Sequence, residues 1–567
     1  MIRLKKGLPQ EICHFGRVLA YDASDNANKI VVNYVNYQGI FGNVSLQFGL
    51  YCAHAFKHMQ GGKAMKAGGF AKFVMCVAAL LPPGVALGQS NAIRIVLAIP
   101  VSTVDPCEMS RAYVGVFLKQ NVIETLTQLQ PGTSAIVPRL AVSWERRDPY
   151  TWRIKLRQGV RFHDGSSFNS AAVVAALKRI GNPVLPCAQR RTFLSGITLS
   201  PKAVDDYTVD ITSDERLALL PAYLVQLGMT SPNTDPDKFS DHPVGTGPYM
   251  LASWDPSKEV VLQRFHGYWG KKPEVQKATY VWQADAAMRA SMVERGEADI
   301  GVQIAIQDAT NPNTDYFYLS SDTSRVRIVM QPPLDDIRVR KALNLSFDRQ
   351  ALIGTIFSSK VVKATQQILP SIDGHNPELK VWPYDVERAR QLISEARVAG
   401  APVEKEIVLY GRRNTYANSE ASMQEMVQMW REIGLNIRLK MLDSPEWLKL
   451  SNKPYAHERP PMLIQDTHDN AVGDAAFTMM FYYTSAGNKS DLTDPIVDAL
   501  LSEASAATGE ERRKLFQAAN KYIQQNVVPD VIMYHMISVM RISPRLRYQP
   551  NLTTNGKIEL SNITFNK

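Results

Sequence analysis

The sequence predicts an α/β protein with two or three lobes. Segments with strand-like alternation are interleaved with amphipathic helical segments along most of the chain. Near residue 434 a helix is followed, through a glycine turn, by a strand, which is the repeating unit of an α/β fold. The chain has 567 residues, and the 479 that follow residue 88 exceed what one ordinary hydrophobic core holds.

Strand and helix signals can be assigned in order through the first half. The apolar run at 93–100 is typical of a buried strand that Pro100 ends. Residues 150–162 alternate between apolar and basic side chains and then meet an Asp-Gly turn, so we expect a strand and a hairpin turn. The stretch at 169–181 predicts a capped helix, and 258–265 predicts a further strand.

The second half continues the same mixture. Residues 384–400 and 418–434 predict amphipathic helices, and 436–442 predicts the strand after the second one. Another helix begins at Asp494, an N-cap followed by proline at the first helical position. The last long helix begins with a Thr-x-x-Glu pattern at 508–511, which predicts a capping box.

Residues 65–88 have the layout of a secretory signal peptide, although they lie inside the chain. A short basic segment precedes an apolar run of about nine residues, half of the roughly 20 that span a bilayer. Small residues before Gln89 predict cleavage between Gly88 and Gln89. A short buried helix is the alternative. Residues 1–64 fit no export signal, and we expect an over-extended start or a leader that leaves with the signal.

Composition argues against several classes of protein. The net charge is +10, but without residues 1–88 it is 55 basic against 51 acidic residues, or +4, with no block of like charges. A nucleic-acid role therefore has little support. No CxxC, HExxH or paired-histidine spacing occurs, so we expect no cofactor and no metal site built by the protein. Cys107 and Cys187 could form a disulfide after export or remain buried thiols.

Five blocks of sequence, taken together and in order, carry a family resemblance. They lie at 138–179, 243–254, 262–270, 292–302 and 332–353. Their content and spacing resemble the extracellular solute-binding proteins of family 5. Members of that family serve ABC importers for dipeptides, oligopeptides, nickel complexes and related solutes. The likeness runs from about residue 93 to residue 545.

The resemblance implies a bilobal α/β fold of the type II periplasmic-binding-protein class, with an extra subdomain inserted in lobe I. Lobe I would hold 89–326, including the inserted subdomain at about 115–244. The chain would cross near 325–333 into lobe II, which would extend from 327 to 538, and the tail at 539–567 would return to lobe I. Two crossing segments would form a hinge, with the ligand between the lobes.

The resemblance also implies a ligand site. Dipeptide-binding members grip the ligand carboxylate with an arginine ahead of a long helix, and Arg413 falls at the matching distance before Trp430. Arg412 is the second choice. Asp469 matches the aspartate that holds the ligand's α-ammonium, but the pattern W-x-x-D-x-x-D-P around it is altered in 464–483. This departure weakens the expectation of plain dipeptide recognition.

Four more residues are candidates, each with a structural alternative. Asp474 could bind a cation or could serve as an N-cap. His468 could be a pH-sensitive contact or a ligand of a metal complex, although a histidine with satisfied hydrogen bonds is the commoner case. Tyr416 and Tyr482 could be walls of the site or core residues.

The expected function is that of a periplasmic substrate-binding protein that acts as a monomer. It would capture a peptide or peptide-like solute and deliver it to ABC permease subunits in the inner membrane. An enzyme is not expected, because no G-x-S-x-G, P-loop or S-x-x-K motif with partners occurs. A ligand-sensing receptor on the same scaffold, or a binder of glutathione-like peptides, opine conjugates or nickel chelates, remains an alternative.

Overall fold

The computed structural model describes most of the second of two units into which the chain divides, Gln89–Lys567. The described residues are 91–130, 135–413, 415–470, 472–551 and 557–566. The signal segment expected at 65–88 and the residues before it lie outside them. Within the described ranges, no helix is long and apolar enough to cross a membrane.

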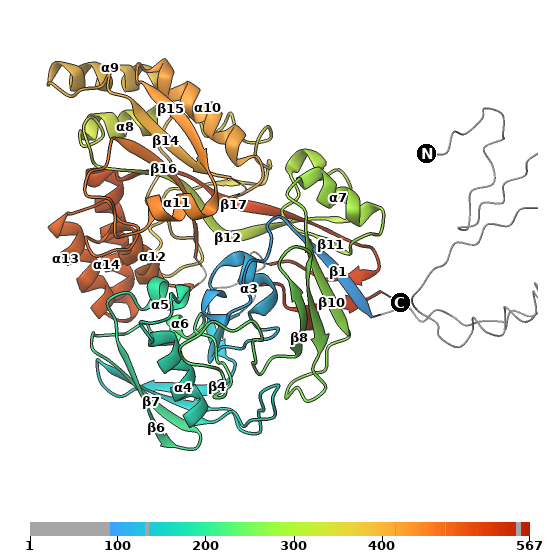
Figure 1. Ribbon diagram of the computed structural model, residues 1–567. Coiled ribbons are helices and arrows are strands. Elements are labelled where there is room, and N and C mark those ends of the chain that lie inside the picture. Colours follow the sequence, from blue (N-terminus) through green and yellow to red (C-terminus); the bar gives the residue numbers. More distant parts are fainter. Residues whose placement is uncertain (1–90, 131–134, 414, 471, 552–556, 567) are drawn as a thin grey trace, which may run out of the picture. The chain divides into compact units, whose positions relative to one another are not determined.

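A mixed sheet of eleven strands runs through both lobes (Figure 1). Its order is β15-β14-β16-β12-β17-β11-β1-β10-β9-β8, and β13 pairs with β17 beside this path. We call the part with β1 and β8 to β11 lobe I, and the part with β14 to β16 lobe II. The bounds are β1 (Ala92–Leu97), β8 (Tyr249–Asp255), β9 (Glu259–Arg264), β10 (Lys277–Trp282), β11 (Ile300–Gly301), β12 (Asp315–Ile328), β13 (Val362–Lys363), β14 (Ile407–Arg412), β15 (Ile437–Leu442), β16 (Met462–Asp469) and β17 (Asp530–Ile542).

Two long antiparallel strands, β12 and β17, join the lobes. The first half of β12 pairs with the end of β17 that adjoins β11, and its second half pairs with β16. Leu319 pairs with Ile537 and Thr323 pairs with His535, so three residues of β12 lie opposite one residue of β17. The connection is therefore a two-stranded ribbon with a bulge at 320–322.

Alternating side chains of the lobe II sheet face different helices. Leu463 belongs to the core under α8 to α10, whereas its neighbours Met462 and Ile464 pack with Trp447 of α11. This alternation is the period of a strand buried on both faces. The helices of this half are α8 (Ile337–Leu345), α9 (Val386–Val398), α10 (Ser419–Glu432), α11 (Ser444–Ser451), α12 (Ala475–Tyr483), α13 (Pro495–Ala506), α14 (Gly509–Tyr522) and the π-helix η3 (Ile523–Val527).

The chain between β1 and β8 contains a second sheet, with the order β4-β5-β7-β6. We call residues 141–223 the small-sheet region. The inserted subdomain expected at about 115–244 remains a prediction. The elements are η1 (Pro106–Glu108), α3 (Ala112–Leu118), β2 (Thr127–Leu129), β3 (Ile136–Pro138), β4 (Ala141–Arg146), β5 (Thr151–Leu156), α4 (Ser170–Gly181), α5 (Ala188–Phe193), β6 (Leu199–Asp205), β7 (Thr208–Ser213) and α6 (Leu220–Tyr223). Lobe I also holds α7 (Ala286–Glu294) and η2 (Ile306–Asp308). The C-terminal tail contains β18 (Leu546–Arg547), η4 (Leu560–Asn562) and β19 (Thr564–Phe565).

Most of the helix starts that the sequence predicts are confirmed. Asn169 accepts a hydrogen bond from the backbone of α4, and Asp494 accepts two from α13. The capping box at 508–511 is wrong. Thr508 occupies the N-cap position of α14 in an extended conformation, but its side chain accepts no backbone hydrogen bond. The N-cap residue was predicted correctly, but its predicted hydrogen bonding was wrong.

The motif Gly-Thr-Gly-Pro-Tyr at 245–249 holds two backbone segments close together. A Cβ atom on Gly245 would lie 2.0 Å from a facing carbonyl oxygen, and one on Gly247 would lie 2.2 Å from another. Only glycine fits where two backbone segments lie this close together. Tyr249 is fully buried and donates a hydrogen bond to the carbonyl of Val275 at 3.0 Å.

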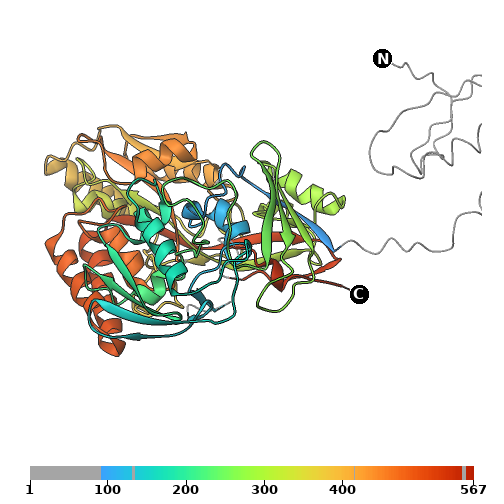
Figure 2. The same cartoon turned by 60° about the horizontal axis from the view of Figure 1, so that its bottom comes forward.

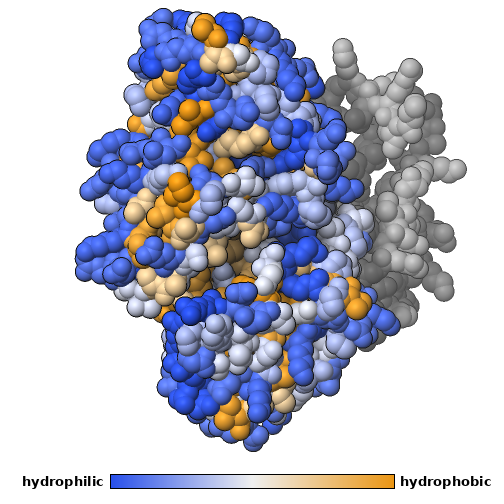
Figure 3. All heavy atoms as spheres, turned by 90° about the vertical axis from the view of Figure 1, so that its left-hand side faces the viewer, coloured by the Kyte–Doolittle hydropathy of each residue, from blue (hydrophilic) through white to orange (hydrophobic). Residues whose placement is uncertain are grey.

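The small-sheet region contacts lobe II directly. In Figures 1 and 2 the helices α12 to α14 lie beside α5 and α6, and one apolar core spans both groups. The ring of Phe477 on α12 lies 5.1 Å from that of Phe193 and 6.2 Å from that of Tyr223. Figure 3 shows that this side is hollowed near its middle, with hydrophobic residues gathered around the hollow. The small-sheet region and lobe II are thus in apolar contact.

Candidate ligand site between the lobes

The candidate site lies where two parallel strands of lobe II end. Arg412 is the last residue of β14 and Asp469 is the last residue of β16, and the two strands pair in parallel. Ligands of α/β proteins bind outside the carboxyl ends of such strands. The backbone N–H of Arg412 donates to the side chain of Gln465 on β16 at 2.9 Å, which fixes the end of β14 against its neighbour.

The guanidinium of Arg412 retains hydrogen-bonding capacity. It stacks on the ring of Trp447 at 4.7 Å, and its Nε donates to Thr415 at 2.9 Å. Its two terminal nitrogens have no hydrogen-bond partner in the part of the chain that the structure describes. Burial lowers the pKa of Arg412, Asp466 opposes this shift, and the like charge of Arg111 in lobe I adds to it. A guanidinium held this way suits bidentate binding of a carboxylate.

Arg413 lies in a different environment from its neighbour. Half of its side chain is exposed, and it lies 3.5 Å from Glu420 and 3.7 Å from Asp443. Exposed ion pairs of this kind contribute little to stability or binding. Of the two adjacent arginines, Arg412 has the geometry that the sequence analysis assigned first to Arg413.

Asp469 lies against the bulge of β12. Its carboxylate accepts a hydrogen bond from the hydroxyl of Ser321, and Asp322 lies opposite it in the strand register. Burial and the charge of Asp322 raise the pKa of Asp469 to about 6, while Lys119 opposes the shift. Lys119 follows α3, so a cation from outside lobe II lies near enough to act electrostatically on this carboxylate.

A cluster of charges that the sequence analysis did not identify lies under the site. The buried carboxylate of Asp466 is 3.1 Å from Lys489 and 3.7 Å from Arg325. Arg325 also pairs with Asp530 at 2.8 Å. The ammonium of Lys489 lies 4.6 Å from the ring of Trp447. Arg325 and Asp466 lie inside strands β12 and β16, and buried charges are almost always paired, as they are here.

His468 and Tyr482 form a buried pair beneath this cluster. The Nδ1 of His468 shares a hydrogen bond with the Tyr482 hydroxyl at 3.1 Å, and its Nε2 shares one with Thr478 at 2.7 Å. Burial lowers the pKa of His468 to about 3. Both ring nitrogens are engaged, so neither is open to a ligand metal complex. Tyr482 is buried, with the guanidinium of Arg325 at 4.0 Å from its ring.

Asp474 and Tyr416 lie away from this cluster. Asp474 accepts a hydrogen bond from the N–H of Ala476 as the N-cap of α12 and pairs with Arg512 at 2.6 Å. Tyr416 is half-buried, and its hydroxyl lies 3.1 Å from that of Ser422. The structure therefore brings Arg412, Asp469, His468 and Tyr482 to the same part of lobe II and gives Asp474 a capping role.

A cavity of about 60 Å³ lies beside the bulge of β12. Its polar lining residues include Asp322, Thr467 and Ser538. Apolar side chains from both lobes complete the lining, among them Ile304, Ile356, Phe357, Tyr416 and Met536. Among the described residues, no group of three or more His, Cys, Asp and Glu side chains could hold a metal ion.

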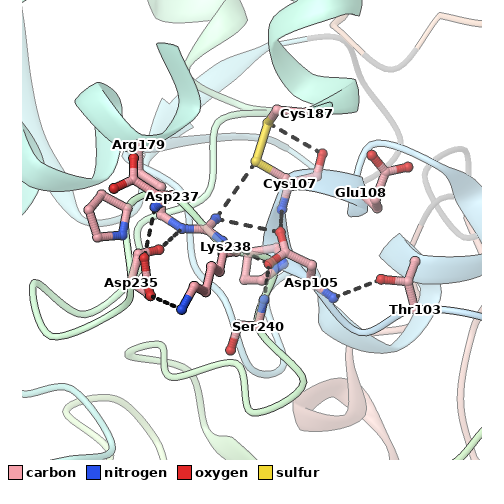
Figure 4. A network of polar contacts seen from close by, with 12 residues as sticks. Thr103, Asp105, Cys107, Glu108, Arg179, Cys187, Asp235, Asp237, Lys238 and Ser240 are labelled. Atoms are coloured by element: carbon pink, nitrogen blue, oxygen red, sulfur yellow. Dashed lines mark hydrogen bonds and ion pairs between the residues drawn. A yellow bond between two sulfur atoms is a disulfide. The ribbon is translucent and has the colours of Figure 1, made fainter. Parts of the chain in front are cut away.

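The loop of lobe I that faces the site is fastened by a disulfide. Cys107 and Cys187 are bonded, which resolves the two alternatives left by the sequence (Figure 4). Beside the disulfide, Asp105 forms a buried ion pair with Arg179 at 2.8 Å. Asp105 also accepts hydrogen bonds from the backbone of Cys107 at 2.7 Å and of Ser240 at 2.5 Å.

A carboxylate of this loop, Glu108, lies between two arginines that the sequence analysis did not single out, Arg111 of the same loop and Arg191 of α5. Glu108 is buried, forms an ion pair with Arg111 and lies 3.8 Å from Arg191. Two arginines thus share one carboxylate on the lobe I side. Arg111 is close enough to Arg412 to lower its pKa. A guanidinium on the lobe I side thus lies near enough to act electrostatically on Arg412.

Comparisons with known proteins agree with this architecture. Residues 135–490 match the family model described as bacterial extracellular solute-binding proteins, family 5 middle. Glutathione-binding protein GsiB of Salmonella typhi is 33% identical over 309 residues, which cover 52% of this chain and 59% of that protein. GsiB of Shigella flexneri serotype 5b is 28% identical over 399 residues, covering 67% and 76%. The chain thus spans about three fifths of the length of the Salmonella relative.

Solved structures share the fold at low sequence identity. A periplasmic binding protein DppA from Helicobacter pylori, in complex with the peptide STSA, has a TM-score of 0.71 and 20% identity, covering 84% of this chain and 98% of that one. AgaA from A. tumefaciens R10, in complex with agropinic acid, has a TM-score of 0.72 and 22% identity, covering 84% and 99%. NikA from Staphylococcus aureus, in complex with Ni(L-His)2, has a TM-score of 0.68 and 18% identity, covering 84% and 100%.

Proposed function

Because this chain belongs to the bacterial extracellular solute-binding proteins of family 5, we propose that it captures a small solute between its lobes and delivers it to the permease of an ABC importer. The observation that carries the proposal is the Arg412 guanidinium, which stacks on Trp447 at the carboxyl end of β14 with two nitrogens unbonded to the described chain. A ligand carboxylate could accept hydrogen bonds from these two nitrogens.

The proposed ligand class is peptides and peptide-like carboxylates. It is supported by the printed ligands of similar proteins, which are glutathione, a peptide and the opine agropinic acid. We assign the carboxylate contact to Arg412 and keep Arg413 as the second candidate. Asp474 has less support as a contact for a ligand cation, because it already caps α12 and pairs with Arg512. Tyr416 is proposed as a wall of the cavity beside the site.

The proposed mechanism is closure around a bound charge. A ligand that touches Arg412 in lobe II and the charged loop of lobe I interacts with both lobes only when they are together, so it shifts the population toward the closed state. Binding alone performs this function and no covalent step is needed. We further propose that the protein is exported, that its signal is cleaved between Gly88 and Gln89, and that it acts as a monomer in the periplasm.

Two measurements test this proposal. Native mass spectrometry of protein purified without refolding should detect a co-purified carboxylate solute. Isothermal titration with that solute should then give roughly 10- to 150-fold weaker binding for Arg412→Gln, because hydrogen bonds to charged groups contribute about 1.5–3 kcal/mol. Arg413→Gln is the matched control and should stay within about threefold of the wild type. Wild-type affinity in Arg412→Gln, or turnover of a peptide by the purified protein, would contradict the proposal.

A further inference from the structure

We infer that Trp447 is a positioning residue that makes the site select a solute carboxylate over the neutral carboxamide of the same shape. The inference rests on the proposed function, in which Arg412 binds that carboxylate. It goes further because it assigns the selectivity to a buried side chain that need not touch the solute. The contacts that place the indole, and those that hold the guanidinium of Arg412, carry the inference.

The fold fixes the indole of Trp447. This residue belongs to α11, the helix that follows β15, and its side chain is 2% exposed. It packs with Leu442, Met462 and Ile464 in one apolar cluster. The indole N–H donates a hydrogen bond to the backbone carbonyl of Gln465 on β16 at 3.1 Å. A buried ring that is held by packing and by a hydrogen bond keeps one orientation whether or not a solute is bound.

The residue that anchors the indole also fixes the backbone of Arg412. The side-chain oxygen of Gln465 accepts the backbone N–H of Arg412 at 2.9 Å. Gly411 permits this approach, because a Cβ there would lie 2.5 Å from the sulfur of Met441 and 3.3 Å from the side-chain oxygen of Gln465. The end of β14 and the indole are therefore fastened to the same residue of β16, which sets their positions relative to each other.

The side chain of Arg412 is held by two contacts. Its guanidinium carbon lies 4.7 Å from the centre of the Trp447 ring, and its Nε donates to the hydroxyl of Thr415 at 2.9 Å. That hydroxyl donates in turn to the backbone carbonyl of Arg412 at 2.9 Å. The two terminal nitrogens remain unbonded within the described chain. A guanidinium that is already oriented loses less conformational freedom when it forms two parallel hydrogen bonds with a carboxylate.

A second cation near the same ring already has a partner. The ammonium of Lys489 lies 4.6 Å from the centre of the Trp447 ring and 3.1 Å from the carboxylate of Asp466. Arg412 forms no ion pair with a residue that the structure describes. Of the two cations that share this indole, Arg412 is therefore the one whose charge is left for a solute.

A guanidinium held in place discriminates between the two terminal groups. A carboxylate offers two acceptor oxygens, whereas a carboxamide replaces one of them with an NH2 donor. That donor would face an N–H of the guanidinium, and a fixed guanidinium cannot turn away from it. Such a mismatch weakens binding of the wrong solute, which is a source of specificity in addition to the attraction for the right one. Without the ring, Arg412 could turn, and both effects would be smaller.

The test compares free dipeptides with their C-terminal carboxamides by isothermal titration, and its readout is the ratio of the two Kd values in each pair. In Trp447→Met this ratio should fall about 2- to 30-fold, the range expected for loss of a cation–π contact. Trp447→Phe keeps an aromatic ring and should keep the ratio within about threefold of the wild type. A purely structural role would weaken both members of a pair equally, so an unchanged ratio in Trp447→Met overturns the inference.

Trp254 of lobe I provides the matched control. Its indole N–H also donates to a backbone carbonyl at 3.1 Å, that of Val101, and no described lysine or arginine lies over its ring. Trp254→Met should lower the Tm and leave the ratio of Kd values unchanged. An equal fall of the ratio in Trp254→Met and in Trp447→Met overturns the inference, because loss of any buried indole would then have the same effect.

Two more outcomes separate this inference from the proposed function. If Arg412→Gln keeps the wild-type preference for the free carboxylate, the proposed carboxylate contact is wrong, and the inference falls with it. If no member of any pair binds, the proposed peptide-like ligand class is wrong, and the inference is overturned as well. Loss of the preference in Arg412→Gln together with its retention in Trp447→Met overturns the inference alone.

A spectroscopic measurement covers the case in which Trp447→Met does not fold. In protein labelled with fluorotryptophan, the fluorine NMR signal of Trp447 can be assigned by its absence in Trp447→Phe. This signal should move in Arg412→Gln, because the guanidinium beside the ring is removed, and it should stay in place in Arg413→Gln. A Trp447 signal that is the same in Arg412→Gln as in the wild type overturns the inference.

Discussion

Replacing Phe477 by leucine tests whether aromatic contact between the lobes helps to hold them closed. Phe477 is buried on α12 and contacts the rings of Phe193 and Tyr223, which belong to the small-sheet region. Leucine retains much of the apolar surface, so the folded lobe should tolerate the change. The contacts that it removes are the two ring pairs that join one lobe to the other.

The size of the effect can be worked out from these two pairs. An aromatic pair contributes about 0.5–1.5 kcal/mol beyond the burial of its surface, so two pairs contribute about 1–3 kcal/mol. Since each 1.4 kcal/mol is a factor of ten, Phe477→Leu should reduce the ratio of closed to open molecules roughly 5- to 150-fold. Where the open state dominates without ligand, the apparent Kd for the solute rises by the same factor.

Small-angle scattering and isothermal titration measure the two sides of this prediction. The ligand-saturated variant should keep the wild-type radius of gyration, and the Kd should rise. Phe481→Leu is the matched control, because Phe481 stacks on Phe477 at 5.7 Å and its ring is half-buried in lobe II. It should lower thermal stability without changing the Kd. Unchanged affinity in Phe477→Leu, or equal loss in both variants, would refute the reasoning.

Three further predictions concern stability. Burial lowers the pKa of His468 from 6.5 to about 3, so between these pH values the unfolded chain binds a proton that the folded chain does not. The free energy of unfolding should therefore fall by about 1.4 kcal/mol for each pH unit below 6.5. His468→Asn should reduce this slope, measured by urea titrations at several pH values. The Cys107→Ser and Cys187→Ser double variant should lose about 4 kcal/mol in denaturant unfolding, since the bond closes a loop of 80 residues. Gly247→Ala should cost about 3 kcal/mol, because its Cβ meets a backbone oxygen at 2.2 Å, whereas Gly181→Ala, which has open space, should leave the Tm unchanged or slightly higher.

Each of these has an outcome that would contradict it. A pH slope in His468→Asn equal to that of the wild type would show that another group titrates in this window. If the double serine variant is as stable as the wild type, the disulfide does not stabilise this part of the protein. A Gly247→Ala protein with the wild-type Tm would show that the facing backbone moves aside freely.

The local sequence pattern predicted most of the helices and strands, but it could not predict which distant strands pair with each other. The helix at 418–434 and the strand at 436–442 follow from periodicity over a dozen neighbouring residues, and both are confirmed. The parallel pairing of β14 with β16 and the bulge at 320–322 depend on strands that are far apart along the chain. No spacing within one segment encodes such contacts.

The candidate site shows the same division. The family resemblance narrowed the proposed carboxylate contact to two adjacent arginines, and only the structure distinguishes them, because Arg412 stacks on Trp447 while Arg413 pairs at the surface. Lys119 was not identified, because Asp469, whose charge acts on it, lies in lobe II and hundreds of residues later in the chain. Charges that meet only across a cleft leave no trace in local sequence.

The paired strands β12 and β17 restrict how the two lobes can move. Because they are hydrogen-bonded to each other on both sides of residues 320–322, neither can bend alone, and sliding one lobe past the other would break the ladder. Rotation about an axis through residues 320–322, where the ladder is already interrupted, breaks the fewest bonds. Ser321 and Asp322 lie at that interruption and against Asp469, so such a rotation would first displace atoms of the candidate ligand site.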